Sequence, residues 1–303
     1  MGLTDEVRRH AEEIARSAVH VRIDAERLAE YDPGLPEDGS APEPTLDPVR
    51  HYLEGPPAQV ARYMLVLDTI NFGSGWFPTL RKRVDPAVGR AVSGYNTIAW
   101  NLADHWRAGH AWSNEELRAM RTEQIAAALG QPPDHELMSL YAQALRDLGR
   151  WLGDRDALDV VAQAKRSAER LAEMLVDGMA LYNDRGFYKR AQIAPYDLSL
   201  AGVAEFDDLD RLTIFADNLV PHVLRCDGVL VYDDALAADI DAGRLLEPGR
   251  REQEIRGCAV HACELLSRRL GVPARIIDTL LWNRGQQPEY KARPRHRCRS
   301  VYY

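Results

Sequence analysis

Pro56–Phe72 reads P-P-A-Q-V-A-R-Y-M-L-V-L-D-T-I-N-F, and this stretch decides the expected fold. A pair of prolines suits the first turn of a helix, because the missing N–H groups would have no helical partner there. The residues that follow are apolar on nearly every side of a helix of about 3.6 residues per turn. A helix that is apolar all round is buried, so the segment predicts a central helix that other helices cover.

Helical periodicity also marks most of the remaining chain. Residues 4–18 carry one apolar stripe, and Ser113 with Glu116 forms a capping box at the start of a helix over 115–130. Helix start and stop signals bound further segments with the same periodicity. These further helices are predicted at 93–106, 133–152, 156–178, 207–224, 251–271 and 273–285.

Few segments are expected outside helices. Residues 31–48 are rich in proline, glycine and acid, which predicts a loop. Short extended pieces are expected at 186–193 and near the C-terminus, and no convincing run of strands is found. We therefore predict an all-α fold, a single compact multi-helix domain over residues 1–303 with a ligand cleft between helical lobes. Its N-terminal helical part, about residues 1–50, is expected to be variable.

The composition excludes several classes of function. The formal net charge is −8, whereas nonspecific binding of DNA or RNA needs a basic surface that releases counterions. No apolar run approaches the length of about 18 residues that a membrane span needs, and the N-terminus does not have the pattern of a signal peptide. The four cysteines form no C-x-x-C pair, and the histidines lack metal-ligand spacing. We expect a cytoplasmic monomer with no metal, cofactor, membrane contact or stable nucleic-acid complex.

Leu212–Pro221, L-T-I-F-A-D-N-L-V-P, places one carboxylate, Asp217, in an otherwise apolar segment. Burying an ionised carboxylate is costly unless another group pairs with it or the site uses it. Two hypotheses follow. Asp217 caps a helix or pairs with an arginine, which is the commoner case, or it is a preorganised anion in an active site.

Two other segments combine residue types that suit a ligand. Gly186–Ile193 places Lys189 and Arg190 beside two aromatic residues, a combination that fits a phosphorylated ligand with a ring. Taken alone, this segment is more simply explained as a surface turn. In a helix, Asp278 and Trp282 are four residues apart and share a face, so an acid and an indole could meet one planar ligand.

Together, short motifs along the chain resemble the queuosine salvage protein family, the queuosine 5′-phosphate N-glycosylases. No single motif is strong, but they occur in order from residue 68 to residue 303, and the combination is highly specific. The matching stretches are D-T-I-N-F (68–72), S-G-Y (93–95), F-Y-K-R-A-Q-I (187–193), T-I-F-A-D (213–217), V-P (220–221), E-I-R-G-C (254–258), D-x-x-L-W (278–282) and H-R-x-R-x-x-Y-Y (296–303).

The resemblance implies an all-helical fold similar to that of DNA glycosylases. It also implies hydrolysis of the N-glycosidic bond of queuosine 5′-monophosphate to queuine, a 7-deazaguanine base, and ribose 5-phosphate, so that queuine from degraded tRNA is recovered. By motif match, Asp217 takes the position of the catalytic carboxylate. The ribose 5-phosphate end needs cations, for which Lys189 and Arg190 are the candidates. The family's base-binding positions fall on His51, which needs an alignment gap, and on Phe215, Asp278, Thr279 and Asn283.

The chain departs from the family pattern at several positions. Asn218 and Leu219 stand where the family usually has an aromatic residue and an arginine, and residues 73–75 delay the next aromatic residue after N-F. Thr279 replaces a frequent aromatic residue, and Asn283 replaces a frequent acid. These differences bear on base recognition rather than on the reaction.

Two alternatives stay open at this point. A noncatalytic binder of queuine or queuosine nucleotides would use Asp217 only for recognition and would return the nucleotide intact. A base-excision DNA glycosylase is suggested by the implied fold, but the acidic net charge and the lack of a basic stripe count against it.

Overall fold

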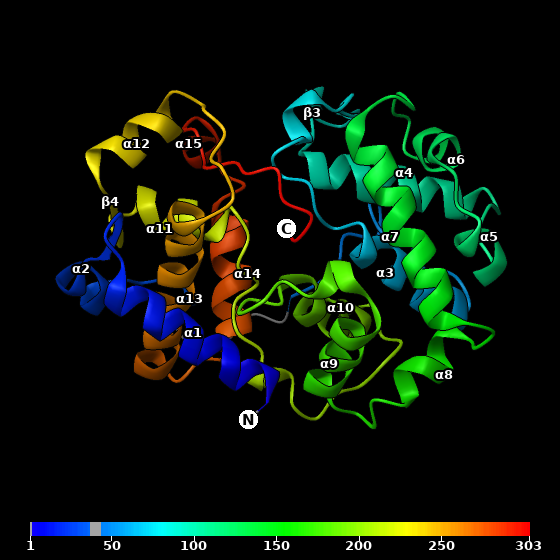
Figure 1. Ribbon diagram of the computed structural model, residues 1–303, viewed down its shortest axis with the longest axis horizontal. Helices are drawn as coiled ribbons and strands as arrows, with labels where there is room; N and C mark the ends of the chain where they lie inside the picture. Colours follow the sequence, from blue (N-terminus) through cyan, green and yellow to red (C-terminus); the bar gives the residue numbers. More distant parts are fainter. Residues whose placement is uncertain (1, 37–43) are drawn as a thin grey trace.

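The computed structural model describes residues 2–36 and 44–303 (Figure 1). The middle of the predicted loop, residues 37–43, lies outside the described residues. The α-helices are α1 (Leu3–Ser17), α2 (Ala25–Glu30), α3 (Pro57–Thr69), α4 (Gly94–Arg107), α5 (Asn114–Arg118), α6 (Thr122–Ala128), α7 (Glu136–Leu152), α8 (Ala157–Ala162), α9 (Ala168–Gly178), α10 (Lys189–Leu200), α11 (Val220–Cys226), α12 (Asp234–Asp241), α13 (Arg250–Leu270), α14 (Ala274–Arg284) and α15 (Pro288–Lys291).

The predicted all-α fold is confirmed, because strands are few and short in the described part of the chain. They are β1 (Val21–Ile23), β2 (Val84–Asp85), β3 (Arg90–Ala91) and β4 (Leu230–Tyr232). β1 pairs with β4 and β2 with β3, both antiparallel, so neither sheet has more than two strands. Of the helices in residues 2–36 and 44–303, none is long and apolar enough to cross a membrane.

The predicted central helix is α3. Pro57 occupies its first turn, and the side chains of Tyr63, Met64 and Leu65 are fully buried. Helices α4, α7, α8 and α10 all contact it. Burying each such side chain contributes about 1.5–3 kcal/mol, which makes α3 the centre of the first group of helices.

A second group of helices packs around α13, which contacts α1, α11 and α14. Gly257 lets α1 approach closely, since a Cβ atom there would meet Ile14 at 2.6 Å. Figure 1 shows this group on one side of the molecule and α3–α8 on the other, with α9 and α10 between them. Helix α10 contacts α3 and α9, and α9 contacts α1, so these two helices join the groups.

Two long predicted helices are each divided in two. The helix expected over 115–130 becomes α5 and α6. The helix expected over 156–178 becomes α8 and α9, because Lys165 and Arg166 between them have φ values of +52° and +62°. This left-handed conformation is not compatible with the interior of a right-handed helix.

Two other local predictions are wrong. The helix expected over 207–224 is absent from residues 212–219, and α11 begins only at Val220. Polar side chains from distant elements bond the backbone of this irregular segment and replace its helical hydrogen bonds. The extended piece expected at 186–193 is also wrong, because α10 begins at Lys189. That difference decides which of its side chains reach the site.

Candidate functional site

One cavity of about 640 Å³ gathers residues from both groups of helices and from the irregular segment 212–219. Its walls also include the loop after α3, the start of α4, faces of α10 and α14, and the C-terminal segment. We take this cavity as the candidate active site, because it brings together all but one of the residues predicted from the sequence. The residues that line it are His51, Lys189, Phe215, Asp217, Asp278, Thr279 and Asn283.

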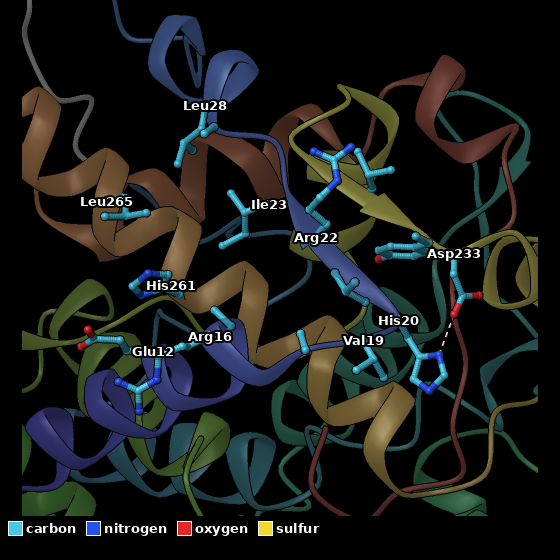
Figure 2. A pocket seen from close by; sticks show the side chains of 16 residues that line it. Glu12, Arg16, Val19, His20, Arg22, Ile23, Leu28, Asp233, His261 and Leu265 are labelled. Atoms are coloured by element: carbon cyan, nitrogen blue, oxygen red, sulfur yellow. Dashed lines mark hydrogen bonds and ion pairs between the residues drawn. The ribbon is translucent and has the colours of Figure 1, made fainter.

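A second hollow, of about 730 Å³, lies beside β1, between α1 and α13 (Figure 2). It contains none of the predicted site residues. Figure 2 shows His20 turned toward Asp233, and the two side chains are hydrogen-bonded at 2.6 Å. The other cavity therefore remains the candidate active site, because it holds the residues that the sequence predicted.

The irregular segment 212–219 is held in place by side chains from α10, α13 and α14. These side chains and the backbone of His296, which also bonds the segment, all belong to the motifs that carried the family resemblance. Their contacts fix the backbone on both sides of Phe215. The hydrogen bonds join Thr213 N to Gln192 Oε1 (3.0 Å), Phe215 N to Asp278 Oδ1 (2.8 Å), Arg256 Nε to Ala216 O (2.9 Å) and Asn218 Nδ2 to His296 O (3.2 Å).

Asp217 follows directly after this anchored backbone, and its half-buried side chain lines the cavity. Oδ1 accepts the backbone N–H groups of Leu219 at 2.7 Å and Val220 at 3.2 Å, at the start of α11. Among the described residues, no donor is hydrogen-bonded to Oδ2. The capping hypothesis therefore explains one oxygen of the carboxylate, and the other oxygen is available to a ligand.

One face of α14 forms another wall of the cavity. Asp278 is buried, and burial together with the negative charge of Asp217 raises the pKa of Asp278 well above its usual value. The side chains on this face recur at helical spacing, as the sequence predicted for the acid and the indole. The residues of α14 that line the cavity are Asp278, Thr279, Trp282 and Asn283.

Two aromatic rings pack together at the cavity, one from α10 and one from the irregular segment 212–219. The ring centroids of Tyr196 and Phe215 are 5.4 Å apart, and the planes are tilted by 40°. The hydroxyl of Tyr196 also lies 3.3 Å from Oγ1 of Thr279. Both rings line the cavity, so they provide an apolar surface on which a planar base can pack.

His51 lines the cavity from the loop before α3, and both of its ring nitrogens have partners. Nδ1 lies 2.9 Å from the carbonyl oxygen of Asp47, and Nε2 lies 3.2 Å from the hydroxyl of Tyr95. Burial lowers the pKa of His51, which favours the neutral ring. Because a carbonyl only accepts, Nδ1 carries the proton and Nε2 accepts from Tyr95.

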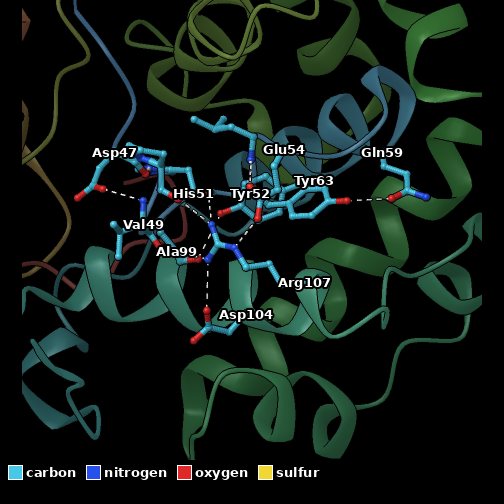
Figure 3. A network of polar contacts seen from close by, with 12 residues as sticks. Asp47, Val49, His51, Tyr52, Glu54, Gln59, Tyr63, Ala99, Asp104 and Arg107 are labelled. Carbon is cyan, nitrogen blue, oxygen red and sulfur yellow. Dashed lines mark hydrogen bonds and ion pairs between the residues drawn. The ribbon is translucent and has the colours of Figure 1, made fainter. Parts of the chain in front are cut away.

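Arg107 on α4 fixes the loop that carries His51 (Figure 3). Its guanidinium donates to the carbonyl oxygens of Pro48 at 2.8 Å, Val49 at 3.1 Å and His51 at 2.7 Å. Figure 3 shows the guanidinium at the centre of this network. The loop is therefore anchored although it lies outside any helix.

One stripe of α10 faces the cavity. Lys189 is buried at the start of this stripe, and its Nζ donates to the carbonyl oxygen of Asn71 at 3.2 Å. Burial lowers the pKa of Lys189, while the negative charge of Asp217 acts in the opposite direction. The residues of α10 that line the cavity are Lys189, Ile193, Tyr196, Asp197 and Leu200.

Arg190 does not line the cavity, which corrects its assignment as a candidate phosphate ligand. Consecutive residues of a helix diverge by about 100°, so Arg190 turns into the core while Lys189 faces the site. Its guanidinium donates to the carbonyl oxygens of Thr69, Leu181 and Val301. Arg190 thus ties together the end of α3, the loop before α10 and the C-terminal segment.

Several charged residues of the cavity were not predicted as site residues from the sequence, and two of them, Arg295 and Asp197, matter for the chemistry. Arg295 lines it but forms no hydrogen bond or ion pair with any described residue; burial lowers its pKa, and the charge of Asp217 opposes this. Asp197 is two helical turns after Lys189, so the helical periodicity of α10 would have revealed it. No signal in the sequence marks Arg295, which directly precedes the last motif.

Comparisons with known proteins show what this chain is similar to. The family described as "Queuosine salvage protein" matches residues 51–303. A protein of Sphaerobacter thermophilus is 33% identical over 282 residues, 86% of each chain. One of Bos taurus is 31% identical over 276 residues, 80% of this chain and 81% of that protein. One of Nematostella vectensis is 28% identical over 281 residues. All three are named queuosine 5′-phosphate N-glycosylase/hydrolase.

Proposed function

Because the chain belongs to the queuosine salvage protein family, we propose that it hydrolyses the N-glycosidic bond of queuosine 5′-phosphate and releases queuine and ribose 5-phosphate. One observation carries the proposal. Motif residues from four distant parts of the chain meet at one cavity, where Asp217 presents a carboxylate oxygen that no described residue bonds.

We assign to Asp217 the stabilisation of the positive charge that develops on the sugar in the transition state. Cleavage of the glycosidic bond passes through an oxocarbenium-like state, in which positive charge develops at C1′ and the ring oxygen of the ribose. A fixed anion in a largely dehydrated cavity stabilises that charge without having to reorganise. The two backbone N–H groups on Oδ1 provide such fixing, because they hold the carboxylate in one orientation.

The leaving group makes this electrostatic contribution important. Many purine glycosidases protonate N7 of the base, but queuine is a 7-deazaguanine and has carbon at that position. The base must therefore be recognised and assisted through its other edges. Its N1–H and exocyclic amine are two adjacent donors, and the carboxylate of Asp278 has the matching pair of acceptors.

Replacing Asp278 with Asn should weaken the binding of free queuine by about 1–3 kcal/mol, because the amide places a donor against a donor. Isothermal titration calorimetry measures this loss. Because burial raises the pKa of Asp278, more carboxylate forms as the pH rises, so wild-type affinity should increase with pH and that of the variant should not. A base without the exocyclic amine should show a smaller loss. Unchanged queuine affinity in Asp278→Asn would assign the guanine-like edge to another group.

The 5′-phosphate carries between about one and a half and two negative charges at neutral pH and needs cationic partners. We assign it to Lys189 and Arg295, which both line the cavity near Asp217. Lys189 was predicted from the sequence, and Arg295 takes the place of Arg190. Phosphate binding away from the breaking bond can be used to orient C1′ against Asp217.

Lys189→Ala and Arg295→Ala should each lower kcat/KM for queuosine 5′-phosphate about tenfold more than for the nucleoside, because only the nucleotide makes the charge-assisted contact. Steady-state kinetics on both substrates measure the difference. Arg293→Ala is the matched control for Arg295, since it removes the same charge from an exposed position outside the cavity. Equal losses on nucleotide and nucleoside would make the substituted residue structural.

Incubation with queuosine 5′-phosphate, the nucleoside and duplex DNA separates the proposal from its alternatives. A hydrolase releases queuine from the nucleotide, a binder returns the nucleotide intact, and a DNA glycosylase releases base from DNA.

The assay is run with and without EDTA. In residues 2–36 and 44–303, no three His, Cys, Asp or Glu side chains are grouped as a metal site requires, and we expect no effect of EDTA. The monomeric state and the cytoplasmic location stay predictions.

A further inference from the structure

Asp68 and Asp197 are buried acids to which the proposed reaction has given no role. Asp68 lies on α3 and is 0% exposed, and neither carboxyl oxygen has a hydrogen-bond partner among the described residues when both acids are ionised. Asp197 lies on α10, is 6% exposed and lines the cavity. Helices α3 and α10 contact each other, and the two carboxyl groups are within hydrogen-bonding reach when one of them is protonated.

The two acids form a pair that holds one proton. Neighbouring carboxylates in a buried setting do not both ionise readily, and a protonated Asp68 donates a hydrogen bond to Asp197. Burial and the charge of Asp197 raise the pKa of Asp68 well above its usual value. Burial raises the pKa of Asp197 to about 6, against the effect of the bond from Asp68. Near neutral pH, Asp68 therefore keeps the proton and Asp197 is the ionised member.

The charge of Asp197 acts on titratable groups of α3, α4, α10 and α14. Lys189 is a cation whose pKa is raised, against the effect of burial, by the negative charges of both Asp197 and Asp217. The groups whose pKa the charge of Asp197 raises are Tyr63, Asp68, Tyr95, Lys189 and Asp278.

The two cavity carboxylates are suited to different tasks. Asp217 is held in one orientation by two backbone N–H groups, which suits a fixed anion. Asp197 instead accepts a hydrogen bond from the protonated carboxyl group of Asp68, which can reorient when Asp197 itself takes up a proton. A general base works best when its pKa lies near the working pH, and glycoside hydrolysis commonly divides its work between two carboxyl groups.

We propose that Asp197 is the general base of this site and that the buried Asp68 is its proton-holding partner. The inference rests on the proposed hydrolysis. As the C1′–N bond breaks, its electron pair leaves with the base, and the oxygen of a water molecule bonds to C1′. One proton of that water passes to Asp197, so the pair then holds two protons. One of them returns to the released base directly or through solvent, which restores the enzyme and balances the reaction.

The test begins with the pH dependence of kcat/KM for queuosine 5′-phosphate. Wild type should lose activity as the pH falls through about 6, because Asp197 must be ionised to accept a proton. Asp197→Asn should lose about 100-fold or more in single-turnover rate at neutral pH and should lack this acid limb. Its affinity for free queuine should change little.

Azide distinguishes a base from a group that only positions its neighbours. Azide attacks C1′ without losing a proton, so it should restore cleavage by Asp197→Ala and yield ribosyl azide 5-phosphate. The same addition should not restore Asp217→Ala to the same extent, because that variant lacks the transition-state charge. A folded Asp197→Ala that binds queuine but gains nothing from azide would overturn the inference.

Asp68 variants give a second test that does not alter the cavity wall. Asp68→Leu removes the donor to Asp197 and should move the acid limb to higher pH, whereas Asp68→Asn retains a donor and should leave the limb near pH 6. An acid limb that stays in place in Asp68→Leu would contradict the pairing. If wild type does not cleave the nucleotide, the proposed function fails. If it cleaves and Asp197→Asn keeps its rate and acid limb, only this inference fails.

Discussion

Asp217→Asn should lower the single-turnover rate of queuine release at least about 100-fold, the usual scale for one preorganised electrostatic group. The amide can still accept the N–H groups of Leu219 and Val220 through its oxygen, so the start of α11 should persist. What is lost is the negative charge at the oxygen that no described residue bonds. Rapid-quench measurement with enzyme in excess isolates the chemical step from product release.

Asp47→Asn is the matched control for this substitution. Asp47 also lines the cavity, but its carboxylate pairs with Arg50 and bonds the backbone of Val49. Its rate should stay near that of wild type, because no role in the reaction is assigned to that charge. A near wild-type single-turnover rate in Asp217→Asn would remove Asp217 from the mechanism.

Arg256→Met should reduce the free energy of unfolding by about 3–5 kcal/mol, the cost of breaking a buried ion pair. The guanidinium of Arg256 is almost fully buried and pairs with Asp184 and, at 3.3 Å, with Glu252. It also donates to the carbonyl oxygen of Ala216 at 2.9 Å. Removing it leaves two buried acids without their cation and frees the backbone next to Asp217.

Urea unfolding followed by circular dichroism measures this loss. Arg268→Met is the control, because Arg268 lies on the same helix α13 with an exposed side chain and should change stability by no more than about 0.5 kcal/mol. Comparable stability of the two variants would contradict a structural role for the Arg256 cluster. Activity should fall in folded Arg256→Met as well, since the segment that carries Asp217 loses one of its anchors.

Helices were predictable wherever local periodicity and burial agree. The segment Pro57–Thr69 is apolar around its whole circumference, so burial and helical propensity favour the same structure. Residues 212–219 are also largely apolar. Their backbone groups, however, form hydrogen bonds with side chains of α10, α13 and α14, which lie more than 20 residues away in the sequence. A local sequence pattern cannot reveal such long-range contacts, so the helix that it predicted there is absent from the structure.

Most of the residues that the sequence singled out line one cavity, whereas their roles stay predictions. Motif matching assigned Asp217 and the α14 residues to one site, and they line the same cavity although they lie about 60 residues apart in the sequence. It could not separate Lys189 from Arg190, because that distinction depends on the phase of α10. The pairing of Asp68 with Asp197 depends on how α3 packs against α10, which no local pattern encodes.

The sequence also left two explanations for Asp217 open, a helix cap and a preorganised anion, and the two oxygen atoms of the carboxylate allow both at once. Oδ1 caps the start of α11, and Oδ2 is bonded by no described residue. A carboxylate can thus stabilise the fold and serve the site at once. The structural bond is what makes the catalytic role physically reasonable, because it fixes the anion before substrate arrives.

The most direct test of the account is a time course of queuosine 5′-phosphate with the enzyme in molar excess, in which queuine and ribose 5-phosphate are quantified together. Both products should appear at the same rate and in equal amounts, and Asp217→Asn should slow both at least about 100-fold. Recovery of the nucleotide intact from wild-type enzyme, even with tight binding, would contradict the account.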